Sequence, residues 1–186
     1  MIDKVVLGIG GLPGSGKSTV ASVAAADGWA VISMGDVVRQ IAAELGVEPT
    51  AENLGELTFE LRKERGSTII AERCVEKAER LPHAFLVIEG LRTPDELKLF
   101  RARFKGFRLL AVVAPDDHRF RNLYARRRED DPKGFRDFKA RDRREERLGI
   151  RKVLREAEYV VVNDKDLDAL QEQTRELVRR LKELAG

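Results

Sequence analysis

Apolar and polar positions along the chain follow two rhythms, and each rhythm predicts one type of secondary structure. Short runs rich in Val, Ile, Leu and Phe have the length of buried strands, and they lie at residues 5–9, 30–32, 84–88, 107–114 and 159–162. Longer segments with helical periodicity predict helices at residues 17–27, 35–45, 53–64, 68–80 and 166–184, and a further one that begins at Thr93. Strands that alternate with helices are typical of βαβ units, so we expect an α/β fold with a five-stranded parallel sheet flanked by helices.

Glycine, proline and capping residues predict where several helices begin and end. Gly28 and Gly46 each follow a predicted helix, at the position where a residue with positive φ is favoured. The sequence Thr93-Pro94-Asp95-Glu96 predicts a helix start, because it has Thr as the cap, Pro in the first turn and Glu at the reciprocal capping position. A turn is expected at residues 130–134, which read Asp-Asp-Pro-Lys-Gly.

Length and composition narrow the class of protein. A chain of 186 residues with 42% hydrophobic residues and no internal repeat suits a single domain, 1–186, with insertions expected at about 47–66 and 117–152. The longest uncharged apolar stretches, 84–88 and 109–115, are far shorter than the roughly 20 residues of a membrane-spanning helix. No signal-peptide pattern is present, and Cys74 is the single cysteine, so we expect a reducing, cytoplasmic compartment and no membrane partner.

Positive charge is concentrated in one segment of the chain. Residues 117–152 contain 14 Lys and Arg against 8 Asp and Glu, a local net charge of +6, although the whole chain carries only +3. A cationic segment on a body of opposite net charge points to an anionic ligand, either phosphate groups or nucleic acid.

A phosphate-binding loop follows the first predicted strand. The pattern G-x-x-x-x-G-K-[ST] is matched at every specified position by Gly11-Leu12-Pro13-Gly14-Ser15-Gly16-Lys17-Ser18. Glycines let the backbone wrap closely around an anion, and successive N–H groups and the helix N-terminus then face the phosphates. We expect this loop, together with Thr19, to bind ATP, with Lys17 at the β- and γ-phosphates and the Ser18 hydroxyl on Mg²⁺.

Glu89 ends the most apolar of the predicted strands and is followed by Gly90. In parallel sheets, ligands bind beyond the carboxyl ends of the strands. An exposed acid at a strand end is the common case, but beside a phosphate-binding loop we favour a functional role. Glu89 is therefore predicted to hold Mg²⁺ through water or to orient the acceptor.

The segment after the second strand carries a family resemblance. Together with the loop, Ile32-Ser33-Met34-Gly35-Asp36-Val37-Val38-Arg39 resembles the opening of adenylate and related nucleoside monophosphate kinases, whose I-S-T-G-D-x-x-R segment has Met34 in place of Thr here. The resemblance implies that Arg39 binds the acceptor's phosphate and that Asp36 helps to orient the acceptor or the metal. The stretch from Val87 to Arg92 is similar to the family's D-G-F-P-R segment, although it is one residue shorter and has Glu for Asp, and it implies Arg92 as a second phosphate ligand.

The last third of the chain looks more like dephospho-coenzyme A kinase, a neighbouring family. The likeness covers residues 157–163 and the helix that follows, but Ser33 stands where that family has an acidic catalytic residue. Asn163 stands where related kinases contact the purine, and a simple strand-ending turn explains it equally well. Together the likenesses span nearly the whole chain, which is identified as a divergent member of the nucleoside monophosphate kinase superfamily, similar to archaeal adenylate-kinase-related proteins. They imply a three-layer P-loop NTPase fold with an acceptor-binding insertion and an Arg-rich lid.

The Arg-rich segment 117–152 allows two interpretations. The resemblance implies a lid of two helices that closes over the phosphates, in which Arg126 and Arg128 stand where lid arginines occur. The alternative is a solvated helical pair stabilised by ion pairs three or four residues apart, which accounts for most of its arginines. The arginines concerned are Arg119, Arg121, Arg126, Arg127, Arg128, Arg136, Arg141, Arg143, Arg144 and Arg147. His118 and the phenylalanines are expected at the surface and in packing, respectively.

These observations favour an enzyme that uses ATP and Mg²⁺ to phosphorylate a small phosphate-bearing or nucleotide-like acceptor. Such a transfer needs positioning and charge neutralisation, and a monophosphate acceptor needs no strong base. The alternatives are a dephospho-coenzyme A kinase and a nucleotide-switched ATPase that binds RNA through its Arg-rich segment. The identity of the acceptor and the oligomeric state are left open.

Overall fold

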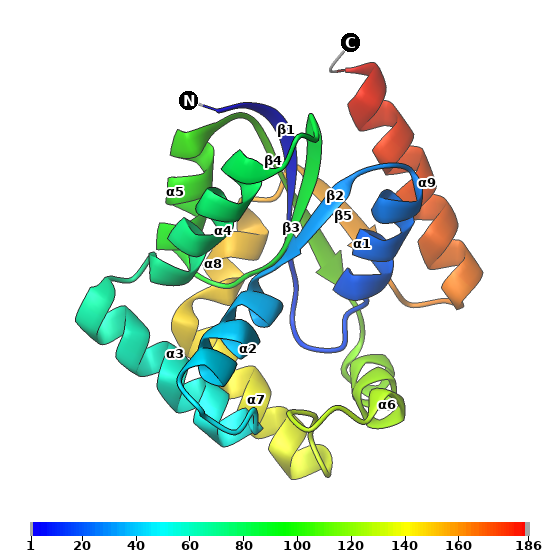
Figure 1. Cartoon of the computed structure of the whole chain (residues 1–186). Helices are drawn as coiled ribbons and strands as arrows, with labels where there is room; N and C mark the ends of the chain where they lie inside the picture. Colours follow the sequence, from blue (N-terminus) through cyan, green and yellow to red (C-terminus); the bar gives the residue numbers. More distant parts are fainter. Residues whose placement is uncertain (1, 185–186) are drawn as a thin grey trace.

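A parallel sheet forms the centre of the molecule (Figure 1). The computed structural model describes residues 2–184, and their strands are β1 (Ile2–Gly10), β2 (Ala30–Ser33), β3 (Phe85–Leu91), β4 (Phe104–Val113) and β5 (Tyr159–Val162). The strands lie in the order β2-β3-β1-β4-β5, and each neighbouring pair is parallel. The predicted α/β architecture with a five-stranded parallel sheet is therefore confirmed, and all strands end at one edge of the sheet.

Helices cover both faces of the sheet. Within the described residues they are α1 (Lys17–Ala26), α2 (Met34–Glu44), α3 (Ala51–Arg65), α4 (Ile69–Arg80), α5 (Pro94–Arg103), α6 (Asp116–Arg126), α7 (Phe135–Leu148), α8 (Ile150–Arg155) and α9 (Leu167–Glu183). Helices α1 and α9 lie on one face and α4, α5 and α8 on the other, while α2, α3, α6 and α7 surround the carboxyl edge of the sheet (Figure 1). The two predicted insertions correspond to α3 and to the pair α6 and α7.

The core is divided by the sheet into two apolar layers. On one side, Val20 and Ala24 of α1 and Leu170 and Val178 of α9 pack against alternate residues of the central strands. On the other side, residues of α2, α4, α5 and α8 pack around a stack of Phe100 with Phe104 and Phe107. Two buried faces explain why the strands read as continuous apolar runs instead of alternating ones.

Several predicted helix ends are confirmed. Gly28 and Gly46 follow α1 and α2 with φ of +87° and +68°. Thr93 and Glu96 form the reciprocal capping box of α5, with the Glu96 N–H donating to Thr93 Oγ1 at 3.2 Å and the Thr93 N–H donating to Glu96 Oε2 at 3.1 Å. The Glu96 carboxylate is fully buried, and it also accepts from Arg62 of α3 at 2.9 Å. This ion pair fastens α3 to the body of the domain.

Three strand boundaries differ by more than one residue from those predicted, and the first is that β1 begins at Ile2 instead of Val5. Strand β3 does not end at Glu89 but continues to Leu91, because Gly90 with φ +99° forms a bulge that lets Gly10 of β1 pair with Leu91. Strand β4 begins at Phe104, three residues earlier than predicted. Gly106 makes this possible, since a Cβ there would lie 2.9 Å from the Lys4 carbonyl oxygen of the neighbouring strand.

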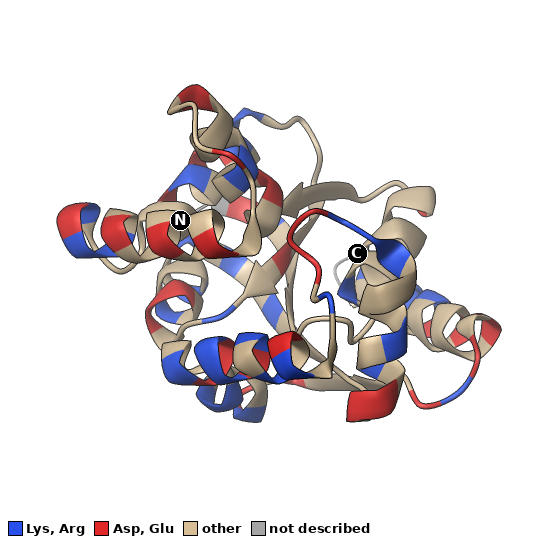
Figure 2. Ribbon diagram, turned by 90° about the horizontal axis from the view of Figure 1, so that it is seen from below, with Lys and Arg blue, Asp and Glu red and all other residues tan. Residues whose placement is uncertain are grey.

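Charged residues of both signs alternate along the outer helices (Figure 2). Five of the ion pairs among the described residues join positions three or four residues apart, such as Arg121 with Asp117 on α6, and the others join residues farther apart in the sequence. Within residues 2–184, no helix combines the length and the apolar character that crossing a bilayer requires.

Candidate functional site

The loop between β1 and α1 has the backbone of an anion-binding site. Gly14 and Gly16 have φ of +80° and +104°, which side chains disfavour. Space is also lacking, because a Cβ on Gly14 would lie 2.3 Å from the Arg119 carbonyl oxygen and one on Gly16 would lie 2.7 Å from Asn163 Nδ2. The two glycines are thus required by the close packing of α6 and of the β5–α9 loop against this turn.

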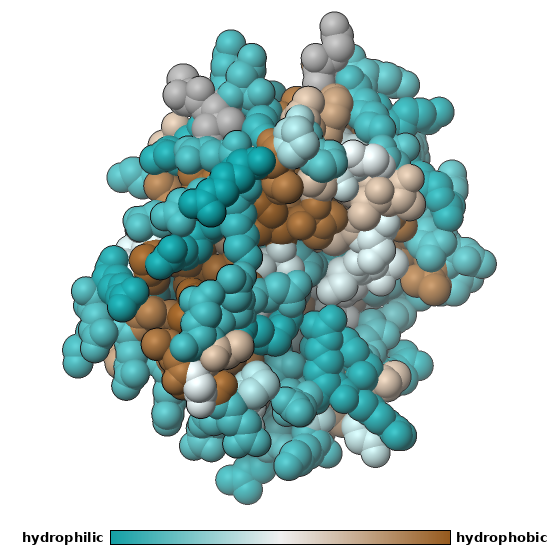
Figure 3. All heavy atoms as spheres, viewed as in Figure 1, coloured by the Kyte–Doolittle hydropathy of each residue, from teal (hydrophilic) through white to brown (hydrophobic). Residues whose placement is uncertain are grey.

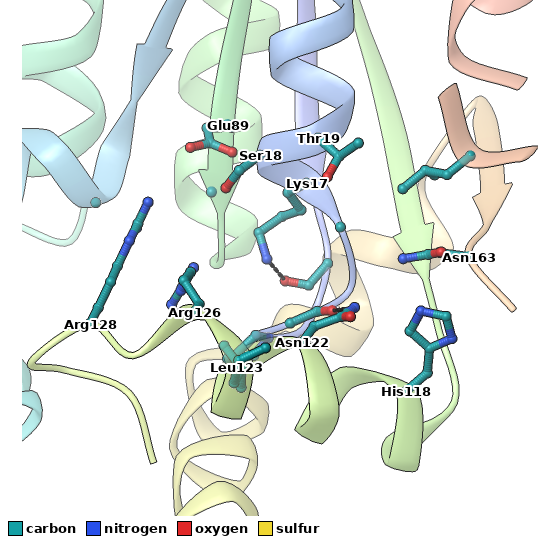
Figure 4. Close-up of a pocket in the computed structure, with 18 of the residues that line it drawn as sticks. Lys17, Ser18, Thr19, Glu89, His118, Asn122, Leu123, Arg126, Arg128 and Asn163 are labelled. Atoms are coloured by element: carbon teal, nitrogen blue, oxygen red, sulfur yellow. Dashed lines mark hydrogen bonds between the residues drawn. The ribbon is translucent and has the colours of Figure 1, made fainter. Parts of the chain in front are cut away.

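Lys17, in the first turn of α1, folds back over the loop. Its ammonium group donates to the carbonyl oxygens of Gly11 and Leu12 at 2.8 and 3.0 Å. Figure 4 shows the Lys17 side chain turned toward the loop. Burial lowers the pKa of Lys17 from 10.5 to about 8, although Glu89 and Glu145 act in the opposite direction. Both partners are uncharged carbonyl oxygens, so phosphate oxygens, which are charged, would be stronger hydrogen-bond acceptors for this ammonium group.

A cavity of about 550 Å³ opens above this loop. It gathers side chains from β2, α2, β3, α6, α7 and the β5–α9 loop, which are far apart in the sequence. Of the residues predicted to bind or act, those that line it are Gly11, Pro13, Gly14, Gly16, Lys17, Ser18, Thr19, Arg39, Glu89, Arg92, Arg126, Arg128 and Asn163. The structure thus brings most of the predicted site together. Leu12 and Ser15 belong to the loop but do not line the cavity.

Ser18 and Glu89 lie beside one another at the N-terminus of α1 (Figure 4). The carboxylate of Glu89 forms no ion pair with the described residues, although basic groups surround the cavity. Within residues 2–184 no cluster of three His, Cys, Asp or Glu side chains could enclose a metal ion. A hydroxyl and one free carboxylate fit Mg²⁺, which keeps several waters and is held by few protein ligands together with phosphates.

Asp36 does not line the cavity, although the resemblance implied a role in orienting the acceptor or the metal. It lies at the start of α2 with its side chain exposed, and its Oδ1 accepts from Arg39 Nε at 3.2 Å and from Arg39 NH2 at 2.5 Å. Arg39 in turn reaches the cavity. The structure therefore makes Asp36 a partner of Arg39, one step removed from the cavity.

Arg92, which follows β3, is paired with a residue that the sequence did not single out. Its NH1 lies 3.2 Å from Oε1 of Glu145 on α7, and both side chains line the cavity. Glu145 is buried, which is uncommon for a carboxylate without a partner. A signal was present in the sequence, since Arg141 and Glu145 are four residues apart and share one face of α7.

Arg126 and Arg128 enter the cavity from the end of α6 and the loop that follows (Figure 4). Both Arg126 Nε and Arg126 NH2 donate to the carboxylate of Asp131, at 2.9 and 2.5 Å, and this carboxylate also accepts from the Arg128 N–H. The guanidinium of Arg128 forms no ion pair with the described residues. Of the two predicted arginines, Arg126 is therefore held by an ion pair, whereas the Arg128 guanidinium has no carboxylate partner among the described residues.

Arg141 of α7 is a further cavity residue that the sequence did not identify as special. Its side chain is largely buried and pairs with Asp130 at 3.0 Å. Burial holds the pKa of Arg141 below its usual value, and the positive charge of Arg92 adds to this effect, while Asp130 opposes it. An anion bound between Arg92 and Arg141 would relieve this unfavourable crowding of charge.

The opposite side of the cavity is formed by His118 and Asn122 of α6 and by Asn163 (Figure 4). Asn163 Nδ2 donates to the Ser15 carbonyl at 3.0 Å, and Asn122 Nδ2 donates to the Gly14 carbonyl at 2.9 Å, so both amides brace the loop. His118 was expected at the surface, and the structure instead places it half-buried among the lining residues. The helical spacing of His118 and Asn122 puts both on the face of α6 that meets the loop.

Arg119 is fully buried, whereas the resemblance implied lid arginines that reach phosphate. Its NH1 donates to the Pro13 carbonyl at 3.0 Å and to Asp142 Oδ1 at 2.9 Å, and its NH2 donates to Asp142 Oδ2 and Asp116 Oδ1, both at 2.6 Å. The guanidinium also lies 4.6 Å from the ring centre of Phe138. Arg119 thus joins α6, α7 and the loop.

A second cavity, of about 450 Å³, continues from the first between α3 and α7. Both cavities are lined by Gly35, Arg39, Arg92, Asp130, Arg141 and Glu145. The shared residues make one continuous cleft, with the glycine-rich loop at one end and the space between α3 and α7 at the other. Its second half was expected only as an unspecified acceptor-side insertion.

Comparisons with known proteins agree with this geometry. Residues 10–139 match the sequence profile of the family described as "AAA domain". The chain is 38% identical over 182 residues to a UPF0200 protein of Methanothermobacter thermautotrophicus, covering 98% of this chain and 93% of the relative. It is also 38% identical to a UPF0200 protein of Thermococcus onnurineus, covering 95% of this chain and 98% of the relative.

Solved structures show the same fold at low sequence identity. A shikimate kinase from Bacteroides thetaiotaomicron is 17% identical with a TM-score of 0.61, covering 96% of this chain and 98% of that one. A gluconokinase from Sinorhizobium meliloti is 15% identical with a TM-score of 0.54, covering 98% and 96%. These likenesses confirm the predicted P-loop NTPase fold, and the chain belongs to the UPF0200 family.

Proposed function

We propose that this protein is a kinase that moves the γ-phosphoryl group of ATP to a small molecule carrying a phosphate, with the help of Mg²⁺. One observation carries the proposal. A single cleft holds the phosphate-binding loop with Lys17 at one end and arginines from α2, the end of β3 and α7 at the other. Donor and acceptor would then meet in the space between Lys17 and Arg92.

The donor side would hold ATP by its phosphates. The N–H groups of the loop and the N-terminus of α1 face the anion, and Lys17 supplies a positive charge. Ser18 and Glu89 would hold Mg²⁺, which bridges the phosphates and neutralises charge as it develops. His118 and Asn163 lie at the far side of this cavity, where the nucleoside would extend.

The acceptor side would bind a phosphate between Arg39, Arg92 and Arg141. All three line the cleft, and each is oriented by a carboxylate, namely Asp36, Glu145 and Asp130. Guanidinium groups held in this way present fixed forks to phosphate oxygens. The lowered pKa of Arg141 also supports an anion there, because such a ligand would restore a favourable environment for its positive charge.

The transfer itself would depend on position and charge. A terminal oxygen of the acceptor phosphate attacks the γ-phosphorus, and the bond from that phosphorus to the β–γ bridging oxygen breaks, so that ADP leaves with the electron pair. The acceptor phosphate is already ionised at neutral pH and needs no strong base. Arg126 and Arg128 reach the same cavity and would stabilise the charge that develops on the transferred group.

Purified protein with ATP and Mg²⁺ should form ADP in the presence of the right acceptor. The panel should include nucleoside monophosphates, dephospho-coenzyme A and small phosphomonoesters, and Lys17→Ala is the control for contaminating activity. ADP formation by the wild type alone supports the proposal. No acceptor-dependent ADP with any compound would contradict it.

RNA binding, the other function considered, is separated by a salt titration. An RNA-binding ATPase should lose RNA affinity steeply and log-linearly with salt. The structure does not favour this function, because Arg119, Arg121, Arg126 and Arg141 of the basic segment are engaged by carboxylates of the same segment.

A further inference from the structure

The second cavity has walls of two different kinds. One wall is a single stripe of α3, with its residues three or four positions apart: Ala51, Leu54, Gly55, Thr58, Phe59 and Arg62. The facing wall is a stripe of α7 formed by Arg141, Arg144, Glu145, Arg147 and Leu148. A largely apolar stripe of α3 therefore faces a basic stripe of α7 across a space large enough for a small molecule.

The arginines of this cavity differ in whether they are paired. Arg39, Arg62, Arg92 and Arg141 each have a carboxylate partner, among them Glu96 for Arg62 and Glu145 for Arg92. Arg144 and Arg147, which line the end away from the phosphate-binding loop, have no ion-pair partner within residues 2–184. Two unpaired guanidinium groups facing one cavity leave room for an anion that the protein itself does not supply.

We infer that the acceptor carries two anionic groups separated by an apolar portion. This inference rests on the proposed kinase function and names the substrate class of the same site. The inner group is the phosphate that receives the phosphoryl group near Arg92 and Arg141. The outer group, a carboxylate or a second phosphate, is bound by Arg144 and Arg147. With a rise of about 1.5 Å per residue, Arg147 lies about 9 Å farther along α7 than Arg141, which sets the scale of the separation.

The apolar portion of the acceptor would lie against α3. Phe59 is 68% exposed although it lines the cavity, and Leu54 lies on the same stripe. Figure 3 shows apolar side chains gathered over α2 and α3 within a largely hydrophilic face. The described lining of this cavity contains no Asn or Gln. The Thr58 hydroxyl donates its hydrogen bond to the Gly55 carbonyl oxygen at 2.9 Å. The end of the cavity at Arg144 and Arg147 is thus suited to an anionic group. It offers no side-chain amide that could form hydrogen bonds with the edge of a nucleotide base.

Two phosphomonoesters that differ only in a second acid test the inference. Phenyl phosphate has one anionic group and an apolar ring, and 4-carboxyphenyl phosphate adds a carboxylate at the far side of that ring. Their affinities should be measured by calorimetry with Mg²⁺ and a nonhydrolysable ATP analogue present. We expect the carboxylated ester to bind the wild type about tenfold more tightly, as one charge-assisted contact at a partly exposed site provides.

Variants of α7 identify the residues responsible. In the double variant Arg144→Ala with Arg147→Ala, the preference should fall to within about twofold, while the affinity for the ATP analogue stays unchanged. Arg143→Ala is the matched control, because Arg143 is on the same helix and lines neither cavity. It should keep the full preference. Unchanged ATP-analogue binding in all variants also shows that each is folded.

Three results would overturn the inference. The first is equal affinity of the wild type for the two esters, and the second is a preference that survives in the double variant. The third is tighter binding of a short 5′-phosphorylated RNA than of 4-carboxyphenyl phosphate, with the same dependence on Arg144 and Arg147, which would assign the outer end to a nucleic-acid backbone. If the wild type prefers the carboxylated ester but no acceptor yields ADP, the kinase function is contradicted and the two-anion site is supported. The failure of one proposal can therefore be told apart from the failure of the other.

Discussion

Arg119 of α6 and Asp142 of α7 form a buried ion pair, with 2.6 Å between Arg119 NH2 and Asp142 Oδ2. The same guanidinium donates to the Pro13 carbonyl in the phosphate-binding loop. Together with the Asn122 side chain, which donates to the Gly14 carbonyl, this contact anchors α6 to the loop, and the guanidinium of Arg128 beyond it forms no ion pair with the described residues.

Removing one member of this pair should unfold the protein more readily. Arg119→Met leaves the carboxylate of Asp142 buried without a partner, and we expect a loss of about 3–5 kcal/mol in the free energy of unfolding. The double variant with Asp142→Leu as well should lose much less than the two single variants together. Urea denaturation measures all three. Arg121→Met, which removes an exposed pair, should lose no more than about 0.5 kcal/mol, and a similar loss for Arg119→Met would contradict the structural role.

Gly14 and Gly28 form a matched pair for testing the packing of the loop. Both have positive φ, near +80° and +87°, but a Cβ on Gly28 meets no atom within 4 Å, while one on Gly14 would collide with the backbone of Arg119. Gly28→Ala should lose about 1 kcal/mol of stability, the penalty for the left-handed conformation alone. Gly14→Ala should lose clearly more and weaken ATP binding. Equal losses in urea denaturation would show that α6 does not press on the loop.

The affinity for ATP should fall as the pH rises above 8. The pKa of Lys17 lies at about 8 in the folded protein, below its ordinary value of 10.5, so the charge needed for phosphate is lost in the free protein as the pH rises through 8. Raising the pH from 7 to 9 should then weaken ATP binding about tenfold. Lys17→Arg keeps its charge over this range, and its ATP affinity should stay level with pH. A flat profile for the wild type in calorimetry would contradict the shift.

Arg39→Ala should weaken acceptor binding about ten- to a hundredfold, since a charge-assisted contact contributes roughly 1.5–3 kcal/mol. The dissociation constant of ATP should barely change, because the loop at residues 11–18, and not Arg39, is the proposed binding site of the donor phosphates. Arg39→Lys should recover only part of the loss. Asp36→Asn should give a smaller loss in the same direction, as it loosens Arg39 without removing it. Equal losses for ATP and acceptor, or none, would refute the assignment.

Arg126 and Arg128 should affect the rate more than the binding of the acceptor. The double variant Arg126→Ala with Arg128→Ala should lower kcat by at least tenfold and change the acceptor KM less, because these groups would meet charge that develops during transfer. Asp131→Asn should reproduce part of this loss by releasing Arg126. Steady-state kinetics decide, with Arg121→Ala as a control outside the cavity. An unchanged kcat would contradict this role and leave Arg141 as the candidate for stabilising the developing charge.

The loop and the sheet could be predicted from the sequence because their signals are local. A strand, a glycine-rich turn and a helix start lie within residues 5–19, and buried strands are apolar without interruption. The partners of the arginines could not be predicted in this way. Glu145 meets Arg92 only once the fold brings α7 to the segment that follows β3, and Arg119 differs from its neighbours on α6 only in its burial.

The second cavity was hidden from the sequence for the same reason. Its walls come from α3 and α7, which are about 80 residues apart, and each helix alone reads as a solvated amphipathic segment. The strand boundary at Leu91 was missed because a bulge depends on the register with β1, which no single strand reveals.

Helix α3 lines the second cavity and contributes no residue to the first. Thr50 caps its first turn and Gly66 follows its last residue, so both ends of the helix are well defined in the sequence. Exchanging the cavity-lining residues Leu54, Gly55, Thr58 and Phe59, while keeping Arg62 as the anchor on Glu96 and Leu57 and Leu61 in their buried cluster with Ala42, would be a route to new acceptors that leaves the loop at residues 11–18 as it is.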